Sequence, residues 1–171
     1  RVLAALKANA EALAAEGAVG LGTSCGFLAL YQDDLAAVSP VPVATSALLH
    51  IARLQPRRVG VITASAKNLT RAHFEAVGAP RDTPVVGLPE DGSFAGTFLR
   101  NGSTLDREAV EREVVAAGRD LLERYPAVET VVLECTNLPP YKPALAKALG
   151  LPVLDVLDLL KDFYRKVSAR R

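Results

Sequence analysis

The chain has 171 residues, of which 50% are hydrophobic and 23% are charged, and its formal net charge is +1. This composition is typical of a globular protein that buries one core or two small ones, and the interleaved charges argue against nucleic acid or an anionic membrane as a partner. No apolar run reaches the roughly 18 residues of a membrane-spanning helix, and no charged and then apolar leader opens the chain, so we expect a cytoplasmic protein.

Short apolar stretches alternate with helical patterns along the whole chain. In chain order, the sequence predicts a helix over 2–15, a strand over 18–22, a helix over 27–38, a strand over 41–44, a helix from Thr45 or Ser46 to Leu54, a strand over 57–63, a helix over 68–77, a strand over 84–88, a helix from Asp106 to Arg124, a strand over 128–134, a helix over 143–149, a strand over 151–154 and a closing helix from Asp155. This alternation predicts an α/β fold with parallel sheets flanked by helices. Residues 89–106 form the longest stretch without a pattern, which favours either a lid or a plain surface excursion.

The two cysteines of the chain each follow a predicted strand and open a polar turn. Cys25 lies in VGLGTSCGFLALY, and Cys135 lies in VVLECTNLPPY, 110 positions further along. The same spacing relates other apolar, aromatic and proline positions: Leu28 and Leu138, Tyr31 and Tyr141, Leu35 and Leu145, Pro42 and Pro152, and Val43 and Val153. We interpret this register as an internal duplication with one thiol at the same place in each copy.

The duplication predicts two pseudo-symmetric, Rossmann-like lobes, residues 1–54 and 55–171, with the closing helix (155–171) packed on the first lobe. The second copy has two strands, 58–63 and 84–88, before its long helix, whereas the first copy begins at its helix. We therefore expect the first lobe to lack its opening strands in the sequence as given.

Both cysteines are predicted at the carboxyl ends of parallel strands, where ligands bind in open α/β sheets. Free N–H groups at a helix start bind carboxylates, which fits the absence of Arg and Lys from both turns. The same field lowers the pKa of a thiol from about 8.5 toward neutrality, so each thiol is expected to act as a base or an acid near neutral pH. Two such thiols across a cleft would take a proton from one face of a carbon and deliver one to the other face, which inverts a stereocentre.

Other roles for the cysteines stay open at this point. They could form a disulfide, or they could be two inert buried thiols. A pair of nucleophilic cysteine and histidine, or a zinc site, is disfavoured because His50 and His73 lie inside predicted helices, where we interpret both as surface residues.

The segments GTSCGFLAL and VLECTNLPPY, with the repeat between them, resemble the aspartate/glutamate/hydantoin racemase superfamily, whose members use two cysteines and no cofactor. The resemblance covers nearly the whole chain. It implies that Cys25 and Cys135 are the paired acid and base and that Thr63 contacts the substrate. It also implies a carboxylate pocket lined by Thr23, Ser24, Gly26, Thr136 and Asn137. Relatives often have Cys-Asn-Thr where this chain has Cys25, Gly26 and Phe27, so the side-chain hydrogen bonds of that motif are missing here.

The function that the resemblance implies is a cofactor-independent racemase or epimerase of an amino acid of the aspartate/glutamate type, acting by two-base proton transfer at the α-carbon. The expected partner is a small carboxylate, with no metal, nucleic acid or membrane, and the family leads us to expect a homodimer. Three alternatives stay open: a maleate-type cis-trans isomerase, a hydantoin racemase, and a non-catalytic binding protein for small carboxylic acids. An arylmalonate decarboxylase is disfavoured, because such relatives keep only one of the cysteines.

Overall fold

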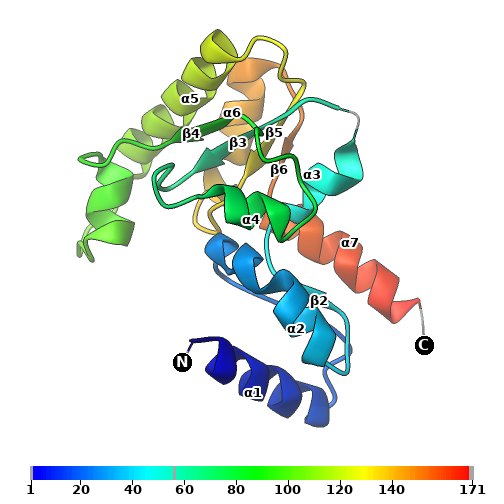
Figure 1. The fold of residues 1–171 in the computed structure, drawn as a ribbon. Helices are drawn as coiled ribbons and strands as arrows, with labels where there is room; N and C mark the ends of the chain where they lie inside the picture. Colours follow the sequence, from blue (N-terminus) through cyan, green and yellow to red (C-terminus); the bar gives the residue numbers. More distant parts are fainter. Residues whose placement is uncertain (1, 56, 170–171) are drawn as a thin grey trace.

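A computed structural model describes residues 2–55 and 57–169 of the chain. The chain forms two parallel sheets of unequal size. Figure 1 shows the larger one with helices packed around it. The larger sheet has four strands in the order β4-β3-β5-β6, and the smaller sheet consists of β1 and β2. The α/β fold with parallel sheets is thus confirmed. None of the described helices combines the length and the apolar character needed to cross a membrane.

The larger sheet has a core on each face. Its strands are β3 (Val59–Thr63), β4 (Val85–Gly87), β5 (Thr130–Leu133) and β6 (Val153–Leu154), and its covering helices are α3 (Leu49–Leu54), α4 (Arg71–Glu75), α5 (Arg107–Arg124) and α6 (Lys142–Leu149). One core joins the sheet to α5 and α6 through residues such as Leu121 and Leu145. The other joins it to α3 and α4 through Ile51 and Phe74. Every residue of β3 and β5 is buried, as expected for central parallel strands covered on both faces.

The smaller sheet repeats part of the larger one. It consists of β1 (Leu21–Gly22) and β2 (Val43–Ala44), joined by the 3₁₀-helix η1 (Gly26–Tyr31) and α2 (Gln32–Val38), and α1 (Val2–Ala15) precedes it. In the larger lobe, β5 leads through the 3₁₀-helix η3 (Pro139–Tyr141) and α6 into β6 in the same order. β2 and β6 begin at Val43 and Val153, which are related by the predicted spacing of 110 residues. The elements around the two cysteines therefore correspond one to one.

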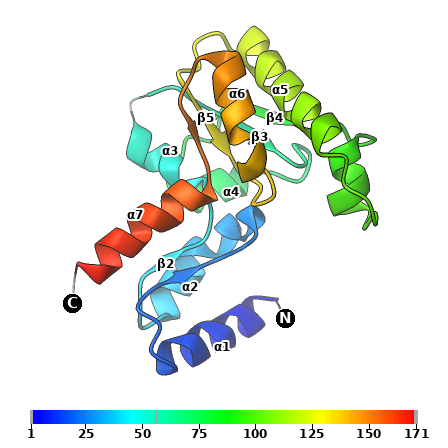
Figure 2. The ribbon, with the colours of Figure 1, turned by 180° about the vertical axis from the view of Figure 1, so that it is seen from behind.

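The helices that follow β2 and β6 each pack against the opposite sheet. α3 follows β2, yet its Ile51 packs with Val61 and Val132 in the core of the larger sheet. α7 (Val156–Ser168) follows β6, and its Phe163 lies so close to Gly20 beside β1 that a β-carbon added there would lie 2.8 Å from Phe163 Cε1. Figure 2 shows α7 beside β2 of the smaller sheet. Residues on each side of the predicted division between residues 54 and 55 thus pack against the sheet on the other side of it.

Several helix boundaries follow from their capping residues. Asp106 accepts a hydrogen bond from the N–H of Ala109 at the start of α5, and Asp155 accepts from two N–H groups at the start of α7, as predicted. Gly150 ends α6 in the left-handed region at φ 66°. The predicted start of α3 at Thr45 or Ser46 is too early: Ser46 Oγ accepts from Leu48 N–H in the preceding turn, and the helix begins at Leu49.

The stretch 89–106, predicted to be irregular, contains a π-helix, η2 (Ala95–Leu99). The carboxylate of Glu113 on α5 accepts hydrogen bonds from the N–H groups of Ser93 and Phe94 at its start. Phe94 is fully buried and belongs to the core between α5 and the sheet. The stretch is therefore fastened to α5 rather than being a plain loop.

Candidate active site

The two cysteine turns, one after β1 and one after β5, lie against each other. The hydroxyl of Thr136 donates a hydrogen bond to the carbonyl oxygen of Ser24 (2.7 Å). A β-carbon added at Gly26 would lie 2.3 Å from the backbone oxygen of Glu134 and 2.0 Å from its Oε1, so only glycine permits this approach. The fold therefore joins two turns that are 110 residues apart in the sequence.

The thiols of Cys25 and Cys135 are both free, so the structure does not support the disulfide alternative. Cys25 is exposed directly before η1, and its carbonyl oxygen accepts the N–H of Leu28 (3.0 Å). Cys135 is half-buried, and its carbonyl oxygen accepts the N–H of Leu138 (3.1 Å). Both turns thus have the same backbone design, with the thiol residue opening a short helical turn.

The surroundings of Cys135 favour its neutral form. Burial raises the pKa of Cys135 from 9.0 to about 11, and negative charge on Glu134 or Cys25 acts in the same direction. A hydrogen bond from the backbone N–H of Asn137 lowers this pKa, but by less than burial raises it. The prediction that the helix start brings the pKa toward neutrality is therefore wrong for Cys135. Because charge on Cys25 acts on the pKa of Cys135, the two thiols are close enough to interact electrostatically.

Glu134 is a buried acid that the sequence analysis did not single out. It follows β5 directly, and only 1% of its surface is exposed. The hydroxyl of Thr63, at the end of β3, donates a hydrogen bond to Glu134 Oε2 (2.7 Å), whereas Oε1 has no hydrogen-bond partner among the described residues. Burial raises the pKa of Glu134 from 4.5 to about 7, and the hydrogen bond from Thr63 opposes this shift. An acidic residue directly after the apolar run 131–133 was the available signal.

The other residues of the predicted pocket fall into two groups. Ser24 and Asn137 are exposed on the two turns beside the thiols, where their side chains are open to a ligand. Thr23 and Thr136 are half-buried and have structural roles: Thr136 joins the two turns by donating to Ser24. Thr23 joins the first turn to the end of β2 by donating to the carbonyl oxygen of Thr45. The fully buried hydroxyl of Thr63 is committed to Glu134. Contacts of these residues with a substrate stay predictions.

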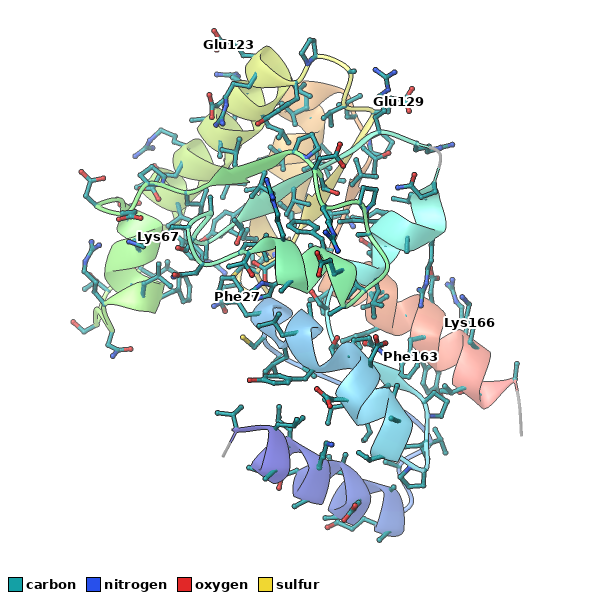
Figure 3. The ribbon with its side chains drawn as sticks, in the orientation of Figure 1. Phe27, Lys67, Glu123, Glu129, Phe163 and Lys166 are labelled. Atoms are coloured by element: carbon teal, nitrogen blue, oxygen red, sulfur yellow. The ribbon has the colours of Figure 1, made fainter. Side chains whose placement is uncertain are left out.

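The interpretation of His50 and His73 as surface residues is wrong, because both are buried. His50 Nε2 lies 3.1 Å from the carbonyl oxygen of Asp155 at the start of α7, so the histidine joins α3 to α7. His73 caps α4 with Thr70 and meets the ring of Phe27 edge-on, with 5.5 Å between the ring centroids. Figure 3 labels Phe27 where η1 meets α4. Burial lowers the pKa of both histidines, which favours their neutral, structural form.

A surface groove of about 460 Å³ lies at the opposite end of the larger sheet. It is lined by the residues before β3, β4 and β5, among them Arg58, Pro84 and Val128. Ligands of open parallel sheets bind beyond the carboxyl ends of the strands, where the cysteines are. This groove therefore does not mark the catalytic site. Among the residues that the structure describes, no group of three His, Cys, Asp or Glu side chains could hold a metal ion.

The comparison with protein families decides the relationship of the chain. A family model described as Asp/Glu/Hydantoin racemase matches residues 1–161. The chain belongs to the Asp/Glu/hydantoin racemase family. The family resemblance inferred from the two cysteine motifs is thereby confirmed.

The chain is also similar to two dimethylsulfoniopropionate lyases. Dimethylsulfoniopropionate lyase 5 of Emiliania huxleyi (strain CCMP1516) is 34% identical over 168 residues, which make up 91% of this chain and 33% of that protein. Dimethylsulfoniopropionate lyase of Durusdinium sp. clade D is 28% identical over 166 residues, or 90% of this chain and 54% of that protein. The chain thus spans between a third and about half of the length of these relatives.

A solved structure shows the same fold. Allantoin racemase from Klebsiella pneumoniae has a TM-score of 0.64 at 18% sequence identity, over 98% of this chain and 66% of that structure. The α/β architecture of the Asp/Glu/hydantoin racemase family therefore extends over nearly the whole chain.

Proposed function

We propose that the two cysteine turns form the site of an enzyme that removes a proton from the carbon next to a carboxylate. The observation that carries this proposal is the hydrogen bond from Thr136 to Ser24, which joins two turns that each present a free thiol. Ser24 and Asn137 are exposed beside the thiols, where a hydroxyl and an amide can hydrogen-bond a carboxylate. The exposed thiol of Cys25 is the base in this proposal.

The reaction that we propose first is cleavage of dimethylsulfoniopropionate, the compound named for the relatives at 34% and 28% identity. Its sulfonium group is attached to the carbon that is β to the carboxylate. When Cys25 takes the α-proton, the electrons of the C–H bond form the C=C bond of acrylate. The electrons of the C–S bond leave with dimethyl sulfide, a neutral leaving group that needs no acid.

The unequal surroundings of the two thiols support elimination over racemisation. Elimination requires one base, whereas a racemase that works in both directions requires each thiol to serve as base in turn. Cys25 is exposed, but burial holds Cys135 in its neutral form, with a pKa of about 11. We propose that Cys135, as a neutral thiol beside the substrate, donates a hydrogen bond to the carboxylate as charge develops on it.

Amino-acid racemisation of the aspartate/glutamate type is the second candidate. It is supported by the presence of both thiols in one site and by the match to the Asp/Glu/hydantoin racemase family model. In that reaction Cys135, as the neutral thiol, would deliver a proton to the face of the carbon opposite Cys25.

One set of assays separates these reactions. Release of dimethyl sulfide from dimethylsulfoniopropionate is measured by gas chromatography, and exchange of the α-hydrogen of aspartate and glutamate in deuterated water is measured by NMR. We expect dimethyl sulfide release, with a loss of at least about 10²-fold in Cys25→Ala because the general base is removed.

Cys135→Ala is the matched control, since it keeps the exposed thiol. A lyase is expected to lose less activity in Cys135→Ala than in Cys25→Ala, whereas a two-base racemase loses activity equally in both. Full activity of Cys25→Ala toward every substrate would contradict the proposed site.

A further inference from the structure

Glu134 is buried where the two cysteine turns meet, and in the described part of the chain no cation offsets a negative charge on it. The hydroxyl of Thr63 donates to Oε2, and the N–H of Ser65 points at the same hydroxyl oxygen (3.4 Å), which directs its single proton toward Glu134. Oε1 has no hydrogen-bond partner, and no positive charge acts on the carboxyl group in the described part of the chain. A proton on this carboxyl group therefore belongs on Oε1.

The unpartnered Oε1 lies against the first cysteine turn. A β-carbon added at Gly26 would lie 2.0 Å from Oε1 and 2.7 Å from Cδ of Glu134. Gly26 directly follows Cys25, and Glu134 directly precedes Cys135. The packing of this one carboxyl group thus sets how closely the two thiol-bearing turns approach.

Ionisation of Glu134 changes this packing. A buried carboxylate without a second hydrogen-bond partner or a cation is unfavourable, and it is relieved when water reaches it. On the side of the first cysteine turn, the tightly packed Gly26 shields Oε1 of Glu134 from water. Admitting water therefore requires the turn of Cys25 to move away from the turn of Cys135.

We propose that Glu134 is a positioning residue whose neutral form holds the two cysteine turns together, and whose ionisation releases the turn of Cys25. The proposal deepens the proposed function and rests on it, because the released turn carries the proposed base. Within the two turns, the titratable groups beside Glu134 are the thiols: Cys135 on its own turn, and Cys25 next to the contacting Gly26. β3 contributes only the uncharged Thr63.

The direct test is hydrogen exchange of the backbone amides in residues 20–31, measured by mass spectrometry at pH 6 and pH 8 and corrected for intrinsic rates. Glu134 has a pKa of about 7 in the closed turn and an ordinary value near 4.5 once exposed. The equilibrium constant for opening of residues 20–31 is therefore expected to increase roughly tenfold from pH 6 to pH 8 in the wild type. In Glu134→Gln, which keeps the shape but has no proton to lose, opening is expected to stay constant.

Variants of Thr63 give a second test that does not depend on Glu134→Gln folding. Thr63→Val removes the hydrogen bond that favours the ionised carboxyl group of Glu134. The increase in hydrogen exchange of residues 20–31 is therefore expected to occur at a higher pH. Thr63→Ser keeps the hydroxyl and is expected to leave the transition near pH 7. A shift to lower pH in Thr63→Val would overturn the proposal.

Activity distinguishes this proposal from the proposed function. The ratio of wild-type kcat to that of Glu134→Gln is expected to fall from pH 6 to pH 8, because kcat follows the fraction of molecules with the turn closed, and by no more than the roughly tenfold change in opening. An exchange transition in a protein without dimethyl sulfide release or α-hydrogen exchange would refute the proposed function alone. Equal exchange at both pH values in an active wild type would refute the role of Glu134 alone.

Discussion

Gly26→Ala tests how closely the two cysteine turns must approach. The added β-carbon would lie 2.0 Å from Oε1, 2.3 Å from the backbone oxygen and 2.7 Å from Cδ of Glu134. An ordinary contact begins near 3.4 Å, so clearing the backbone oxygen alone requires the two turns to separate by roughly 1.1 Å. Rotation of the Glu134 side chain relieves only part of the overlap, because the backbone oxygen stays in place.

The expected loss of stability in Gly26→Ala is about 1–3 kcal/mol, the usual range for overpacking. Urea unfolding measures this loss. Activity is expected to fall by about 10²-fold, because a displacement on the order of 1 Å misplaces the proposed base relative to the substrate.

Gly150→Ala is the matched control for Gly26→Ala. Gly150 has φ +66° and nothing within 4 Å of an added β-carbon, so this change strains the backbone by about 1 kcal/mol far from the thiols and leaves activity intact. The double variant Gly26→Ala/Glu134→Ala is expected to recover part of the lost stability, since it removes the side-chain overlap. If Gly26→Ala unfolds at the same urea concentration as the wild type and keeps its activity, the reasoning about this contact is wrong.

Two further predictions concern stability. Above pH 4.5 the unfolded chain releases the Glu134 proton, whereas the folded chain keeps it up to about pH 7. Between these pH values the free energy of unfolding of the wild type is therefore expected to fall by about 3 kcal/mol relative to that of Glu134→Gln. Urea unfolding at several pH values in this range measures the difference. If the free energies of unfolding of the two proteins changed equally with pH, the burial assigned to Glu134 would be wrong. Asp155→Ala removes the acceptor of two N–H groups at the start of α7 and is expected to lower the free energy of unfolding by about 0.5–2 kcal/mol. Asp106→Ala, which removes one such hydrogen bond, is expected to lower it by less in the same urea experiment, and the reverse order would count against the capping geometry.

The order of the elements was predictable because it depends on local patterns. Apolar runs located all six strands, and Asp106 and Asp155 located two helix starts through hydrogen bonds that span only three residues. The strands are shorter than their apolar runs, since pairing ends where the neighbouring strand ends: the run over 18–22 is paired only at Leu21 and Gly22. The register of 110 residues also predicted that the strands after the two cysteine turns begin at corresponding positions, Val43 and Val153.

The electrostatics of the site were not predictable, because they depend on contacts between distant parts of the chain. Glu134 is buried by Gly26 and Thr63, which are far from it in the sequence. In the sequence alone, an acidic residue after a strand cannot be told from the ordinary start of a polar turn. The pKa of Cys135 depends on the same burial. His50 and His73 were misplaced for a related reason, since α3 and α4 are covered by α7 and η1.

The crossing of α3 and α7 to opposite sheets has a consequence for folding. Ile51 completes the core of the larger sheet, and Phe163 covers Gly20 beside the smaller sheet, so each lobe obtains an apolar helix from the other half of the chain. A chain cut between α3 and β3 would produce two fragments with complementary exposed faces, which are expected to reassociate as a complementing pair. The thiols of Cys25 and Cys135 are consequently brought together by the same cooperative step that completes both cores.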